Sequence, residues 1–197
     1  LLFNRAISYE ETENLEKAIQ DLKESIQYNP FYEKSHLRLA LLCHQQNQTA
    51  QAIMCLNTYL MLTPESEYSQ KVLVLANEIA SRRAPMDAKE KVSMSKSDED
   101  FEEINLILNN KIALSKKYKT KNKIRSSFAV QSHILIEQLK NYNKTNGFWN
   151  EKYIPLFQWI AKNNYYNYMV YTTHYSSSYY KYKNVARKNT GMVKSFL

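Results

Sequence analysis

The sequence predicts an all-α fold, and two observations support this prediction. Leu2–Pro30 recurs as His36–Pro64 at an offset of 34 residues, and each copy has the pattern of two helices ended by a proline. Apolar residues also recur at spacings of three and four along the chain, whereas no alternating pattern of useful length indicates a strand. We therefore expect about two helical hairpins and a capping helix, followed by a second helical module.

The first hairpin is expected over residues 1–11 and 15–28, and the second copy repeats it. Ala6 returns as Ala40, and Ala18 returns as Ala52. We place these small residues where the two helices of a hairpin approach each other closely. Each copy then ends in a proline, which cannot donate the next backbone hydrogen bond of a helix.

This pattern resembles the tetratricopeptide repeat, whose period is 34 residues, over roughly the first 80 residues. The resemblance implies stacked helical hairpins that serve as a binding scaffold. The chain departs from the family at Leu2 and His36, where an aromatic residue is usual, and at Ala6 and Ala40, where glycine is usual. A further helix over residues 66–82 is expected to cover the exposed end of the array.

Residues 84–97 are polar and poor in apolar positions, so they are the expected linker between a repeat domain over residues 1–83 and a helical module over residues 98–197. Ser97 and the acidic residues after it predict a capped helix start. The buried stripe of that helix is Phe101, Ile104, Leu108 and Ile112.

More helices are expected in the rest of the module. The apolar spacing places them at residues 124–142, from Trp149 to Ile160 with a late start or kink at Pro155, and at residues 165–175. Ser176–Ser178 should break the last of these, and one or two short helices should follow, with a restart at Thr190.

The module resembles the helical tail that follows tetratricopeptide repeats in uncharacterised proteins of Bacteroidota. The residues that carry this resemblance are Asp100–Lys117 and the stretch from Gly147-Phe148-Trp149 to Pro155-Leu156-Phe157. It implies no activity. The chain begins within the first helix of a repeat and ends on an apolar run without a stop signal, so we expect it to be a piece of a longer protein.

No pattern of residues predicts a catalytic, metal or cofactor site, and neither a cofactor nor a small-molecule substrate is expected. The four histidines lack the spacing of a metal site, and two glycines are too few for a phosphate-binding loop. The acidic cluster Asp98–Asp100 is explained by helix capping and lacks the spacing of a calcium loop. Cys43 and Cys55 favour buried thiols over a disulfide, because no disulfide framework surrounds them.

The resemblance implies that the first helices of the repeats line a concave face. This face is mostly apolar here, whereas the repeats that clamp the carboxylate tails of heat-shock chaperones use Lys, Arg and Asn. It should take an apolar segment, from a partner protein or from the tail of the chain itself. The matching positions are Phe3, Ile7, Lys34, Leu37, Leu41, His44, Tyr68, Lys71 and Leu75.

Charge is spread unevenly along the chain. Residues 1–80 carry 6 basic and 10 acidic side chains, whereas residues 116–197 carry 15 basic and 2 acidic ones together with eleven of the 16 tyrosines. Such a module can bind nucleic acid or an anionic membrane. The sequence favours solvated loops and half-buried tyrosines instead, since no nucleic-acid-binding motif is present. The candidate residues for binding a polyanion are Lys116, Lys117, Lys119, Lys121 and Lys123.

The first functional hypothesis is therefore a non-enzymatic scaffold or adaptor subunit of a larger assembly, with protein partners. The runner-up is the binding of nucleic acid or an anionic membrane through residues 116–197. A third hypothesis is an enzyme whose active site lies outside this chain. No apolar run reaches the ~18 residues of a membrane span, and the sequence leaves both the cytoplasm and the periplasm open.

Overall fold

The computed structural model describes residues 1–81, 101–109, 122–143 and 146–196, which form twelve helices and no strand. The all-α prediction is confirmed. The helices are α1 (Leu2–Glu11), α2 (Leu15–Tyr28), α3 (Glu33–Gln45), α4 (Thr49–Leu62), α5 (Glu67–Ser81), α6 (Glu102–Asn109), α7 (Ser127–Leu139), α8 (Phe148–Lys152), α9 (Ile154–Lys162), α10 (Tyr166–Thr173), α11 (Tyr180–Lys188) and α12 (Thr190–Phe196).

The 34-residue repeat is visible in the backbone as well as in the sequence. α1–α2 and α3–α4 are hairpins, and the four alanines that the repeat aligns are all fully buried. Their turns contain Glu13 and Asn47 at equivalent positions, and both residues have a positive φ, 57° and 59°. The same backbone turn therefore joins the two helices of each copy, although neither copy has a glycine there.

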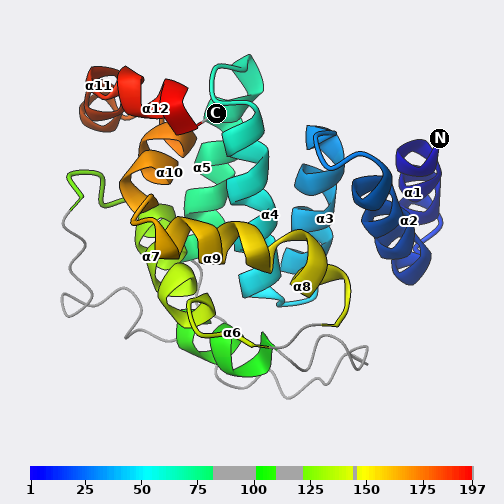
Figure 1. Cartoon of the computed structure of the whole chain (residues 1–197). Helices are drawn as coiled ribbons and strands as arrows, with labels where there is room; N and C mark the ends of the chain where they lie inside the picture. The colour runs from blue at the N-terminus through cyan, green and yellow to red at the C-terminus, as the bar shows by residue number, and fades with distance from the viewer. Residues whose placement is uncertain (82–100, 110–121, 144–145, 197) are drawn as a thin grey trace.

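α5 lies against α4 and buries Leu73 and Ala76, as expected of a capping helix. The opposite side of the array ends in the α1–α2 hairpin, in dark blue in Figure 1.

We call the helices α6 to α12 of the second module the tail. These helices follow the predicted order with different bounds. The helix expected over residues 124–142 starts at Ser127, because the Ser126 hydroxyl oxygen accepts the Ala129 N–H and caps it, and it ends at Leu139. Gly147, with a φ of 102°, comes directly before α8 and is its N-cap residue. The break expected at Pro155 falls at Tyr153, between α8 and α9, and the restart at Thr190 is confirmed as α12.

The tail packs mainly against α4 and α5. α6, α7 and α10 contact α4, and α7 also contacts α5. As a result, twelve of the fourteen residues of α4 are buried. We call the surface of α4, α5 and the start of α3 that contacts the tail the tail-covered face (Figure 1).

One hydrophobic core includes residues of both the repeats and the tail. The linker predicted at residues 84–97 lies outside the described residues, as do Ser97–Asp100 and Ile112. The division into domains at residues 83 and 98 therefore stays a prediction.

Candidate functional site

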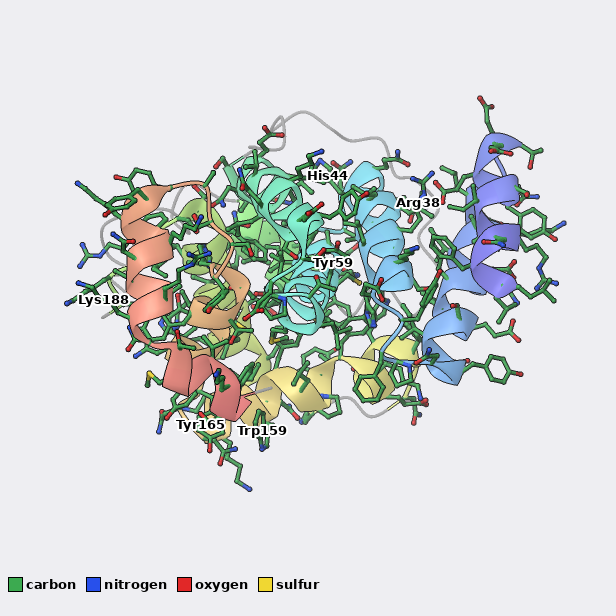
Figure 2. The ribbon with its side chains drawn as sticks, turned by 90° about the horizontal axis from the view of Figure 1, so that it is seen from above. Arg38, His44, Tyr59, Trp159, Tyr165 and Lys188 are labelled. Carbon is green, nitrogen blue, oxygen red and sulfur yellow. The ribbon has the colours of Figure 1, made fainter. Side chains whose placement is uncertain are left out.

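The nine residues predicted to line the concave face lie on α1, α3 and α5. We call them the first-helix face. None of the nine is buried: Lys34, Tyr68 and Lys71 are exposed and the other six are partly exposed. Arg38 of α3, labelled in Figure 2, donates to Glu10 of α1 at 2.7 Å, so an ion pair links the first helices of the two repeats.

The apolar residues of the first-helix face differ in their contacts with the hydrophobic core. Phe3, Leu37 and Leu75 pack against the core from its edge. The Phe3 ring also meets Tyr32 edge-on, with 5.4 Å between ring centroids. An open hollow lies beside Phe3 between α1, the end of α2 and Tyr32, and it includes no other residue of this face.

The tail side chains that bind the repeats do so on the tail-covered face. Asn105 Oδ1 accepts the Ala50 N–H at 2.7 Å, and Asn109 Oδ1 accepts the Thr49 hydroxyl at 2.8 Å. The first N–H groups of a helix have no partner within it, and Gln48 provides no side-chain cap for α4. The tail therefore supplies the cap that α4 lacks.

α5 caps the tail in return, since Asn77 Oδ1 accepts the Phe128 N–H at the start of α7 at 3.2 Å. A third contact joins the middle of α4 to the middle of α7, where Asn57 donates to the Ser132 hydroxyl at 2.8 Å. Both side chains are buried. These polar contacts fix the position of α6 and α7 on α4, because breaking any of them leaves a buried polar group without a partner.

Tyr153 makes a further buried contact between the tail and the repeats. His36 Nε2 lies 2.9 Å from the Pro30 carbonyl, which can only accept, so Nε2 carries the proton and Nδ1 accepts from the Tyr153 hydroxyl at 2.6 Å. The Cys55 thiol in turn donates to the Tyr153 oxygen at 3.2 Å. One tyrosine of the tail thus joins the two helices of the second repeat, in a chain of hydrogen bonds that runs from Cys55 through Tyr153 and His36 to Pro30.

Burial sets the protonation of all three groups. It lowers the pKa of His36, raises the pKa of Tyr153 well above its usual value and raises the pKa of Cys55 to about 12. Cys55 is thus a thiol at neutral pH and a poor nucleophile. Neither Cys43 nor Cys55 forms a disulfide, which agrees with the preference for buried thiols.

Sequence reasoning did not identify Tyr153, His36 and His174 as buried polar residues. His36 and His174 are 3% and 1% exposed, and both are hydrogen-bonded. The position of His36 was the available signal, because it stands where the repeat usually has an aromatic residue. Tyr153 gave no such signal, since its partners lie about one hundred residues away in the chain.

Four of the five lysines predicted to bind a polyanion, Lys116, Lys117, Lys119 and Lys121, lie outside the described residues, and Lys123 is exposed. The described residues include no cluster of metal-ligating side chains. Within the same part of the chain, every helix is too short or too polar to cross a membrane.

The tetratricopeptide repeat family model matches residues 1–32 and 33–66, the same two hairpins that the structure shows. The chain carries two tetratricopeptide repeats. Curated proteins and solved structures offer no match to it. The resemblance of the tail to Bacteroidota proteins therefore stays a prediction. Tetratricopeptide repeats generally bind other proteins and are a non-catalytic fold.

Proposed function

We propose that this tetratricopeptide protein is a non-enzymatic scaffold or adaptor subunit that binds an apolar segment of a partner protein on its first-helix face. Ile7, Leu37, Leu41 and Leu75 supply the apolar contacts, and Lys34 and Lys71 lie at the exposed edges. An apolar helix or strand of the partner would fit such a surface, as in other modes of peptide recognition.

The observation that carries this proposal is the position of the tail. The tail packs against α4, the second helix of the second repeat, and α4 is almost wholly buried. The side chains of the first-helix face are exposed or partly exposed. In Figure 2 the yellow helices α8 and α9 lie along one edge of the molecule and His44 lies toward the other. The described part of the tail thus covers α4, one side of α5 and the start of α3, and it leaves the side chains of the first-helix face exposed or partly exposed.

A single charge tests the proposal. Leu41 is partly exposed on α3, and Gln45 lies one turn further along the same helix and is exposed. Leu41→Glu puts a carboxylate where the partner would bury it without a counter-charge, which is strongly unfavourable. Gln45→Glu adds the same charge at a position that stays in water. Both variants of the tagged protein are purified from its own cells, and the proteins that accompany them are identified by mass spectrometry.

The expected result is that Leu41→Glu loses partners that the wild type and Gln45→Glu retain, with a melting temperature within a few degrees of the wild type. A loss of stability of about 2–4 kcal/mol in Leu41→Glu would show that this face is internal to the protein. Retention of both the partners and the stability would show that the first-helix face is not a binding site.

A further inference from the structure

The last part of the chain carries basic side chains and no acidic side chain that would offset their charge. Residues 152–197 contain seven Lys and Arg side chains and no Asp or Glu. Six of the seven are exposed, namely Lys152, Lys162, Lys181, Arg187, Lys188 and Lys194. None of them forms an ion pair with a described residue. Arg187 contacts the Tyr175 ring instead, which leaves its charge unneutralised.

These charges are concentrated on α11, at the end of the molecule far from the α1–α2 hairpin (Figure 1). α11 carries four of the seven basic side chains within nine residues, and Ala186 is its single buried residue. It packs on α10 and α12. One helix thus displays a dense row of cations on a rigid support, and Lys188 marks its outer edge in Figure 2.

Exposed aromatic rings lie at the start of α11 and on α9. Trp159, Tyr179 and Tyr180 are 44%, 51% and 74% exposed, and they are the large hydrophobic side chains that stand out from residues 122–196. The Trp159 ring is held by Phe196 and Tyr165, with centroids 5.9 and 4.9 Å away. Tyr165 and Trp159 lie together at one corner of the view in Figure 2.

We propose that α11, with the exposed rings of Tyr179 and Tyr180 at its start, binds single-stranded nucleic acid, RNA or DNA. Unpaired cations neutralise phosphates, and exposed rings stack on bases, whichever base is present. A duplex hides the faces of its bases, so it would use the cations alone. An anionic membrane surface also attracts cations that lie beside aromatic rings, so binding to vesicles is the competing outcome of the test. This binding is separate from that proposed for the first-helix face.

The test is the fluorescence anisotropy of a labelled oligothymidylate and a labelled oligouridylate across a series of salt concentrations. The triple variant Lys181→Ala, Arg187→Ala, Lys188→Ala removes three charges from α11. Its control, Lys17→Ala, Lys34→Ala, Lys71→Ala, removes three exposed charges from the repeats. Tyr180→Ala is paired with Tyr28→Ala, since Tyr28 is 78% exposed on α2. All of these side chains are exposed, so we expect unchanged melting temperatures.

The α11 triple variant should flatten the slope of log affinity against log salt by about two units, because single strands contribute about 0.7 per neutralised phosphate. Tyr180→Ala should weaken binding about tenfold. Neither control should change it, and Leu41→Glu should also bind normally.

The proposal is overturned if neither strand binds, if both triple variants behave alike, or if a duplex of the same length binds as tightly as the single strand. It is also overturned if vesicles containing phosphatidylglycerol bind more tightly than the oligonucleotides and the α11 triple variant abolishes that binding.

Discussion

The two helices of the second repeat, α3 and α4, differ in what covers them. α4 is buried along almost its whole length, between α3 and the tail. α3 is buried on the side that faces α4, while Leu37, Leu41 and His44 on its other side are partly exposed. The difference shows that the described part of the tail completes the core around α4 and leaves these three side chains of α3 partly exposed.

The largest expected effect comes from placing a glutamate on each of the two helices in turn. Leu56 of α4 is fully buried, so Leu56→Glu should cost more than about 4 kcal/mol and unfold much of the protein. Leu41→Glu, on α3, should cost less than about 1 kcal/mol in the absence of a partner. Denaturant unfolding followed by circular dichroism measures both. Similar losses in the two variants would contradict the idea that the two faces differ.

The pH dependence of the free energy of unfolding tests the buried His174 in the core of the tail. His174 Nδ1 donates to the Val170 carbonyl, and Nε2 accepts from the Ser126 hydroxyl at 2.7 Å, so the buried ring is neutral. Burial lowers its pKa to about 4. The unfolded chain takes up a proton near pH 6.5 and the folded chain does not, so the stability that His174 contributes is present above that pH and is lost as the pH falls toward 4.

We expect a loss of about 2–3 kcal/mol from His174 between pH 7 and about pH 4.5. Burial also lowers the pKa of His36 and His133, so the wild-type slope contains more than one group. His174→Gln isolates the effect of His174, because its slope should be smaller by about 1.4 kcal/mol per pH unit. Equal slopes in the two proteins would mean that His174 titrates normally in the folded state.

The repeats could be predicted from the sequence because the pattern that marks them is local and occurs twice. Ala6 and Ala18 recur 34 residues later, and each helix of a hairpin packs on a neighbour in the chain. The helices of the tail could also be predicted from apolar spacing, except at their ends, where single caps such as Ser126 decide the bounds.

The docking of the tail could not be predicted in the same way. Asn105, Asn77 and Tyr153 bind partners between 51 and 117 residues away, and their residue types are common throughout the chain. A polar side chain that caps a distant helix leaves no periodic trace in the sequence. For the same reason the sequence placed nine residues on the first helices and offered no hint of which face the tail would cover.

The smallest expected effect comes from one hydroxyl group at the centre of the tail-covered face. Tyr153→Phe keeps the ring, which packs against Trp149 and Phe148, and removes the oxygen that joins His36 to Cys55. His36 Nδ1 is then a buried acceptor without a donor, so we expect a loss of about 1–2 kcal/mol, measured by denaturant unfolding. Tyr180→Phe removes an exposed hydroxyl and should change the stability by less than about 0.5 kcal/mol. A neutral Tyr153→Phe variant would show that packing of the ring, and not the chain of hydrogen bonds, holds the tail on the repeats.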